Sequence, residues 1–277
     1  MEEYYFLFGL AFLWTAFAIV CDMRKREVPN WLNFSLIGFA LAYRAFYALF
    51  SDNISFFVFG VLGFGVFFVL AYAFYYSRVF AGGDAKLLMG FGIILPYSDF
   101  KEFINFGIIF IFFLFLLGSV YSLIYSIFIV IRRKDRFIAE LRKRIRRDYW
   151  ILFISLGAFI LLMFFGFFNS ILLFFSLFFV SFLYFYIKAL DKCMIIKVSA
   201  DKLGEGDWLV KDIRIGKNVI KKSVHGLNME DIKLLKKFDR EIYVKEGIPF
   251  TPAFLFALIT VFFFLILKLP LLSFLLF

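Results

Sequence analysis

The sequence has few of the residues that build disulfide frameworks and metal centres. Cys21 and Cys193 are its two cysteines among 277 residues, no CxxC pair occurs, and His225 is the single histidine. This content excludes a disulfide scaffold and a zinc site built from cysteine or histidine. Because His225 lies in a polar stretch away from the apolar segments, a histidine-assisted serine or cysteine nucleophile is not expected. We predict neither a metal site nor a cofactor.

Apolar residues, in contrast, are in large excess. Hydrophobic residues make up 64% of the chain, with 47 phenylalanines, whereas a soluble domain is about half apolar. The excess lies in runs such as Phe103–Ile131, and about 20 apolar residues suffice for a helix that crosses a bilayer. The chain is therefore predicted to be a polytopic membrane protein. Its first run follows Glu2 and Glu3 without a basic flank, so we expect a retained span rather than a cleaved signal peptide.

The hydropathy pattern predicts an all-α polytopic membrane protein of about eight transmembrane helices with a small α+β cytosolic module. The apolar segments are Tyr4–Cys21, Leu32–Phe50, Ile54–Tyr76, a short one at Asp84–Leu95, Phe103–Ile131, Tyr149–Phe167, Ser170–Ile187 and Pro252–Leu267. The module is predicted from a helix capped at Asn228 and from three strands. The strands are expected at Met194–Ser199, Trp208–Ile215 and Glu241–Lys245.

The net charge of +10 is distributed in a way that argues against a nucleic-acid partner. Segment 132–148 carries nine Lys or Arg against three acids, and segment 188–249 carries fourteen against ten. The connections expected on the opposite side contain one basic residue, Lys101. Basic loops stay in the cytosol, so we predict a multi-pass protein of the cell membrane with its N-terminus outside. Arg132–Arg147 is expected to contact anionic lipid headgroups.

Two aspartates lie at ends of apolar segments on the predicted cytosolic side. Asp22 closes the first segment, and Asp84 opens the short fourth one, which as a helix is about 18 Å long against a hydrocarbon thickness of about 30 Å. Gly82 and Gly83 are expected to allow irregular backbone that carries Asp84 just inside the cytosolic boundary. Taken singly, Asp22 is also explained as an interfacial charge and Asp84 as a helix N-cap.

Considered as a pair, Asp22 and Asp84 indicate a catalytic role. Ionisable residues within the membrane boundary are expensive and are functional candidates by default. Two carboxylates brought together at low dielectric share a proton, so that one activates water while the other protonates a carbonyl oxygen.

The residues around both aspartates resemble the motifs of type IV prepilin peptidases. Asp84 stands in Gly83-Asp-Ala-Lys-Leu87, and Asp22 is followed by Arg24, Arg26, Val28, Pro29 and Asn30. The resemblance covers about Tyr4–Leu95 and implies an intramembrane-type aspartyl endopeptidase, related in mechanism to presenilin, with Asp22 and Asp84 catalytic. It implies prepilin-like or preflagellin substrates whose short basic leader is removed after a glycine at the cytosolic face.

Some features depart from this family pattern. Ala81 replaces the first glycine of Gly-x-Gly-Asp, and the cysteine-rich loop of the bacterial enzymes is missing. The chain is therefore more similar to the archaeal branch, and Val28-Pro29-Asn30 favours the prepilin-type members. Supporting or substrate-binding roles are expected for Gly82, Gly83, Lys86, Arg26, Pro29 and Asn30. For Arg26 and Lys86, interfacial snorkelling is an equal alternative.

Two further segments have competing interpretations. Gly204–Asp207 matches Gly-x-Gly-Asp literally, but its polar flanks favour a β-turn. Glu246–Pro252 either starts the last helix with proline in the first turn or lines the mouth of the site.

Two other functions remain open from the sequence. A presenilin-like protease with other substrates and a proton-coupled transporter also use paired intramembrane carboxylates, although we see no repeat of the aspartate-bearing segments of the kind that transporters often show. The predicted organisation is a catalytic membrane core at 1–131 (spans one to five), a basic cytosolic loop at 132–148, spans six and seven at 149–187, the cytosolic module at 188–249 and a last transmembrane helix at 250–277.

Overall fold

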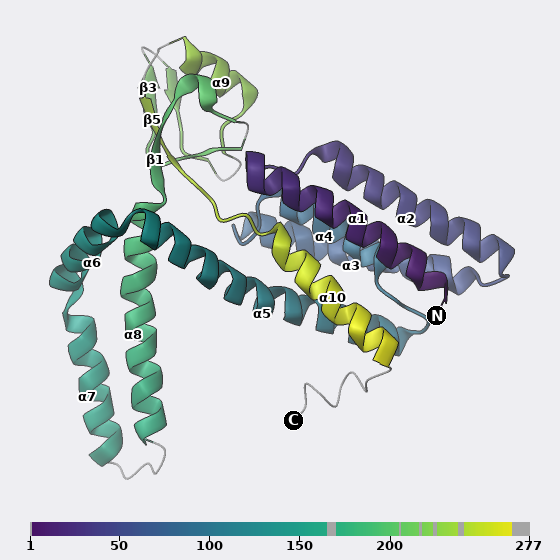
Figure 1. The fold of residues 1–277 in the computed structure, drawn as a ribbon, viewed down its shortest axis with the longest axis horizontal. Coiled ribbons are helices and arrows are strands. Elements are labelled where there is room, and N and C mark those ends of the chain that lie inside the picture. Colours follow the sequence, from purple (N-terminus) through teal and green to yellow (C-terminus); the bar gives the residue numbers. More distant parts are fainter. Residues whose placement is uncertain are drawn as a thin grey trace. The chain divides into compact units, whose positions relative to one another are not determined.

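The computed structural model describes residues 2–164, 170–204, 206–215, 218–223, 226–237 and 241–267 (Figure 1). The chain divides into two compact units, one formed by Met1–Leu123 with Gly247–Phe277 and the other by Ile124–Glu246. The first unit contains both aspartates.

The first unit is a bundle of helices around a short central one. Its helices are α1 (Glu2–Lys25), α2 (Asn30–Phe50), α3 (Ile54–Tyr76), α4 (Gly82–Ile94), the part of α5 (Phe100–Arg132) up to Leu123, and α10 (Thr251–Leu267). The short helix α4 packs against α1, α2 and α3, while α10 packs against α1. Most of α4 from Asp84 to Ile94 is buried, and the helix is apolar from Leu87 onward.

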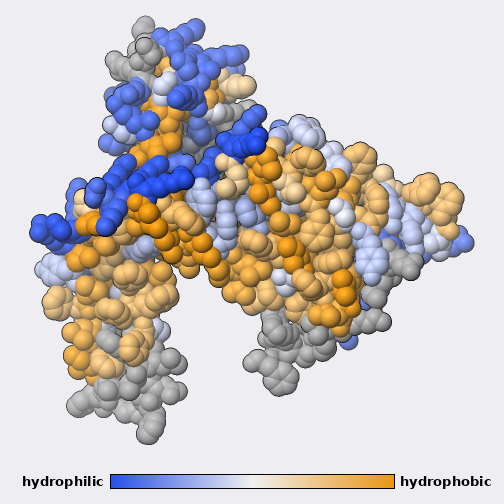
Figure 2. All heavy atoms as spheres, in the orientation of Figure 1, coloured by the Kyte–Doolittle hydropathy of each residue, from blue (hydrophilic) through white to orange (hydrophobic). Residues whose placement is uncertain are grey.

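The chain is a multi-pass membrane protein. Four of the described helices are long and apolar enough to cross a bilayer, namely Glu3–Lys25, Asn30–Phe50, Ile54–Tyr76 and Phe100–Arg132. Trp150–Leu161 and Thr251–Leu267 are apolar but shorter. Figure 2 shows the surface of the first unit as mostly hydrophobic, whereas the strands and α6 of the second unit are mostly hydrophilic. The total of eight spans stays a prediction.

A buried arginine binds the C-terminal end of α4. Arg44 of α2 has no exposed surface and donates hydrogen bonds to three backbone carbonyls, those of Phe56, Ile93 and Leu95, at 2.6, 2.6 and 2.7 Å. Its guanidinium also lies over the ring of Phe56, 4.5 Å from the centroid. The last carbonyls of a helix lack partners within the helix, and a cation there also meets the negative end of the helix dipole. Arg44 therefore lets α4 end inside the protein.

Close contact between α3 and α4 depends on two glycines. A Cβ atom at Gly63 would meet the carbonyl oxygen of Gly92, and a Cβ atom at Gly92 would meet that of Gly63. Small residues at a helix interface allow backbones to approach, which strengthens packing where lipid supplies no hydrophobic driving force. The pair fixes how α4, with Asp84 at its start, lies against α3.

The second unit combines a set of helices with an α+β module. Its helices are the end of α5, α6 (Lys134–Asp148), α7 (Trp150–Phe164), α8 (Ser170–Cys193) and α9 (Met229–Lys236). The strands are β1 (Ile195–Ser199), β2 (Trp208–Leu209), β3 (Ile213–Ile215), β4 (Asn218–Ile220) and β5 (Glu241–Lys245). They form an antiparallel sheet of order β1-β5-β2 and a β3-β4 hairpin.

The module contains the predicted helix and strands, with one predicted strand divided and β4 added. The capping box predicted at Asn228 is present, because its side chain accepts from the Asp231 backbone N–H and the Asp231 carboxylate accepts from the Asn228 N–H. The predicted strand Trp208–Ile215 is divided into β2 and β3, since Val210 donates its N–H to the Tyr243 carbonyl and the chain then leaves the sheet. The module core includes Leu209, Ile232 and Val244.

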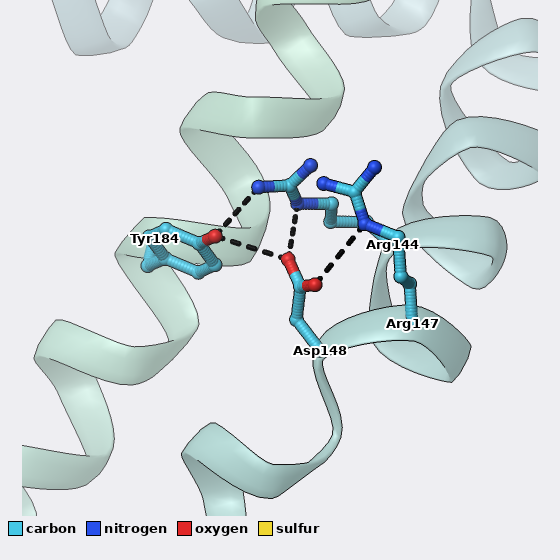
Figure 3. A network of polar contacts seen from close by, with 4 residues as sticks. All are labelled: Arg144, Arg147, Asp148 and Tyr184. Atoms are coloured by element: carbon cyan, nitrogen blue, oxygen red, sulfur yellow. Dashed lines mark hydrogen bonds and ion pairs between the residues drawn. The ribbon is translucent and has the colours of Figure 1, made fainter.

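The basic segment between α5 and α7, expected as a loop, is the amphipathic helix α6. Figure 3 shows how its end is held against α8. Asp148 receives a hydrogen bond from Tyr184 of α8 at 3.0 Å and forms ion pairs with Arg144 and Arg147 at 2.6 and 3.1 Å. Desolvation alone would raise the pKa of Asp148, but the hydrogen bonds from Arg147 and Tyr184 and the two arginine charges hold it below its usual range.

Candidate active site

Asp22 lies near the end of α1, with 7% of its surface exposed. Its carboxylate is bound by the first residue of α10. The Thr251 hydroxyl donates to Oδ2 of Asp22 at 2.9 Å, and the Thr251 backbone N–H donates to the same oxygen at 3.3 Å. The first N–H groups of a helix have no partner inside it, so Asp22 serves as an acceptor for the start of α10. Asp22 is therefore a buried, bonded group rather than an interfacial charge exposed to water.

Asp84 lies in the first turn of α4, with 8% of its surface exposed. The N-cap of α4 is Ala81, which has no side chain to cap with. The interpretation of Asp84 as an N-cap is therefore wrong by three positions. Instead, its carboxylate accepts from the backbone N–H of Ala81, which is how an acid at the third helical position satisfies an N-cap N–H group.

Asp22 and Asp84 are an interacting pair of buried acids. They come from different helices, and the charge of Asp22 acts on Asp84. Arg26, just beyond α1, also acts electrostatically on Asp22. The site thus contains two carboxylates and a nearby cation on the first unit alone.

The other residues expected near the site have structural partners. Lys86 donates from Nζ to the side-chain oxygen of Asn30 at 2.6 Å, which joins the first turn of α4 to the start of α2. Arg26 has a positive φ of 58° and donates its N–H to the Asp22 carbonyl, so it closes α1. The Pro29 carbonyl accepts from the backbone of Leu32 at 3.1 Å at the start of α2.

Gly82 and Gly83 differ from the expectation of irregular backbone. Both are the first residues of α4 and neither has a positive φ. What glycine provides at position 83 is space, because a Cβ atom there would lie 3.1 Å from the Cβ atom of Val28. Irregular backbone occurs earlier, between α3 and α4, where Arg78 has a φ of 63°.

Two residues at the site were not singled out from the sequence. Thr251 is fully buried and binds Asp22, although the chain separates them by 229 positions. Asn33 of α2 is 1% exposed and donates to the Gly83 carbonyl at 3.4 Å. Thr251 lies in the segment Glu246–Pro252, for which the sequence offered two interpretations. Both of its alternative interpretations hold in part, because α10 begins there and its first residue contacts the site.

The literal Gly-x-Gly-Asp match elsewhere forms the predicted turn. Asp207 donates its N–H to the Gly204 carbonyl at 3.3 Å, and its carboxylate accepts from the Gly204 N–H at 2.9 Å. Residue 205 lies outside the described residues. Burial raises the pKa of the Asp207 carboxyl although the Gly204 N–H opposes this shift. Across the part of the chain that the structure describes, no group of three or more His, Cys, Asp or Glu side chains could hold a metal ion.

Comparison with known proteins gives matches to the N-terminal part of the chain. Residues 9–127 match the type IV leader peptidase family, and this stretch includes Asp22 and Asp84 but not Thr251. Over 79 residues the chain is 30% identical to a protein named preflagellin peptidase from Methanocaldococcus jannaschii. That match covers 28% of the chain and 33% of the relative, so the chain spans about a third of that protein's length. No solved structure matches the chain.

Proposed function

We propose that this chain, which belongs to the type IV leader peptidase family through residues 9–127, is an aspartyl endopeptidase that removes short basic leaders from prepilin-like or preflagellin proteins. The observation that carries the proposal is the burial of two electrostatically interacting carboxylates, Asp22 and Asp84, on separate helices. Buried ionisable residues in a membrane protein favour a functional role over a structural one.

The chemistry follows from a shared proton. One carboxylate accepts a proton from a water molecule as the water oxygen attacks the scissile carbonyl carbon, and the other donates its proton to the carbonyl oxygen. Collapse of the resulting tetrahedral diol breaks the C–N bond. The leaving nitrogen takes a proton from the pair, and a hydroxyl of the diol returns a proton to the pair as the product carboxyl group forms. The two carboxyl groups together then again hold one proton, ready for the next cycle.

The proposed topology places this reaction at the cytosolic face. Eight spans, an outside N-terminus and cytosolic basic segments put the end of α1 and the start of α4 on the same side. A leader peptide is extended and polar, whereas the segment that follows it in such substrates is an apolar helix, so the junction is where a protease reaches an extended bond. Lys86 and Asn30, joined by a hydrogen bond, lie at the starts of α4 and α2 and are proposed to border the substrate path.

The experiment is cleavage of a prepilin with a short basic leader by the purified full chain in lipid vesicles, with the product termini identified by mass spectrometry. We expect one cut after the leader glycine, and loss of cutting when that glycine is replaced by a bulky residue. The double variant Asp22→Asn with Asp84→Asn is purified in the same way, and any cleavage that it shows comes from a contaminating protease. Asp207→Asn is the matched control for an aspartate in the same sequence pattern, and it should cleave as wild type. Absence of any leader cleavage by the wild type would refute the proposal.

A further inference from the structure

We propose that Thr251 is a positioning residue that gives the two aspartates different protonation states. Asp22 is the charged acceptor of the water proton, and Asp84 carries the shared proton. The inference rests on the proposed function, and it adds a residue from outside the stretch that matches the family. Its starting point is the pair of hydrogen bonds from Thr251 to one oxygen of Asp22.

These two bonds stabilise the ionised form of Asp22. A carboxylate oxygen that accepts from both a hydroxyl and a backbone N–H has its lone pairs occupied by donors, and hydrogen bonds to the charged form of a carboxyl favour that form. Both donors belong to a residue with no exposed surface. Water therefore does not compete for the carboxylate oxygen from that side.

The surroundings of Asp84 are poorer in donors. Its carboxylate accepts from the Ala81 backbone N–H, and among the described residues no side chain donates a hydrogen bond to it. The nearest cationic side chain on its own helix, Lys86, donates instead to Asn30. Asp84 is about as buried as Asp22 but has fewer hydrogen-bond donors around it. Its neutral form is therefore favoured over its charged form.

The charges around the pair point the same way. Arg26, at the end of α1, acts on Asp22, and the partner charge from α4 is Asp84 itself. The helix α10, which supplies Thr251, has no ionisable side chain between Thr251 and Leu267. The first turns of α2 carry Asn30, Asn33 and Ser35 but no ionisable side chain. The Arg26 charge and the Thr251 donors thus favour charge on Asp22.

The test compares two substitutions at one position with a control on the same helix. Thr251→Val removes the hydroxyl but keeps the shape and the backbone N–H, and Thr251→Ser keeps the hydroxyl. Thr260→Val is the control, because the Thr260 hydroxyl donates to the Phe256 carbonyl within α10. All three are measured as full chains in vesicles, with kcat, KM and the pH–rate profile for leader cleavage.

We expect Thr251→Val to lower kcat about tenfold to a hundredfold, as for loss of a hydrogen bond to a charged group, with KM near the wild-type value. The acidic limb of its pH–rate profile should move to higher pH by about one unit for a tenfold loss. Thr251→Ser and Thr260→Val should keep the wild-type profile. A Thr251→Val enzyme with an unchanged profile, or with activity reduced equally at every pH, would overturn the proposal.

A second readout does not depend on cleavage. Infrared difference spectra of protein labelled with ¹³C in the aspartate carboxyl groups report which carboxyl is protonated at neutral pH. Wild type minus Asp84→Asn should contain a protonated carboxyl band, and wild type minus Asp22→Asn should contain an ionised carboxylate band. The reverse assignment would overturn the division of roles even if no tested substrate is cleaved. If the spectra are as expected but no tested substrate is cleaved, the result counts against the proposed function and not against the assignment of protonation states.

Discussion

Arg44 of α2 donates from Nε to the carbonyl oxygen of Ile93 at 2.6 Å, near the C-terminal end of α4, whose first turn carries Asp84. This fully buried cation binds carbonyls of α3 and of the end of α4, and so joins three helices of the bundle. The short fourth apolar segment is thereby explained, because its C-terminal carbonyls bind protein rather than water or lipid headgroups.

Replacing Arg44 by leucine should destabilise the first unit by about 2–4 kcal/mol, because it leaves buried carbonyls without donors. Arg44→Lys should recover little of this loss, since a single ammonium does not reproduce the planar fork that reaches three carbonyls. Thermal unfolding in detergent measures the effect. Lys101→Leu, an exposed cation in the first turn of α5, is the control. Equal stability of Arg44→Leu and Lys101→Leu would contradict the role of Arg44.

Gly63→Ala should separate α3 from α4 and lower stability by about 1–3 kcal/mol, the usual effect of overpacking. The added methyl group would collide with the Gly92 carbonyl. Leader cleavage should fall as well, because α4 carries Asp84. Gly65→Ala is the matched control on the same helix, where a Cβ atom meets nothing within 4 Å. If both alanine variants melt and cleave alike, the close glycine contact is not what positions α4.

Asp148→Asn should free the end of α6 from α8, because it removes the charge that holds Arg144 and Arg147 (Figure 3). Hydrogen exchange of the α6 amides should become faster, while Asp135→Asn in the first turn of the same helix should change little. Unaltered exchange in α6 of Asp148→Asn would show that the network does not hold this helix.

The same network predicts a direction of pH dependence. The pKa of Asp148 lies below its ordinary value of 3.8 in the folded protein. Its stabilising contribution is therefore fully present above that ordinary value and is lost as the pH falls through the folded pKa. Wild-type protection of α6 should be constant from pH 7 to about pH 5 and decrease in stronger acid, whereas Asp148→Asn should lack this decrease.

Much of the helical layout was predictable because hydropathy follows the chain. The segment Ile54–Tyr76 was predicted with the bounds that α3 has, and the last segment begins within one residue of α10. The basic stretch 132–148 was expected as a loop because its charge dominates the pattern. Its helical form rests on a few apolar residues such as Phe137, which packs in a small cluster with Ala189 of α8.

The site was less predictable, because its contacts join distant parts of the chain. Asp22 and Asp84 were found through local motifs and topology. Thr251 binds Asp22 across 229 positions, and no local pattern indicates such a pair. Arg44 was overlooked for another reason. Its partners are backbone carbonyls, which every residue has, so the sequence shows no complementary charge for it.

The central claim is that Asp22 and Asp84 act as one acid–base pair in peptide cleavage. The most direct measurement is leader cleavage by Asp22→Asn, Asp84→Asn and the double variant in vesicles, with folding checked by thermal unfolding. Each single variant should lose about a thousandfold or more in rate, and the double variant should be no slower than either, because the residues act as a unit. Retained cleavage in either single variant, or losses that multiply in the double variant, would contradict the claim.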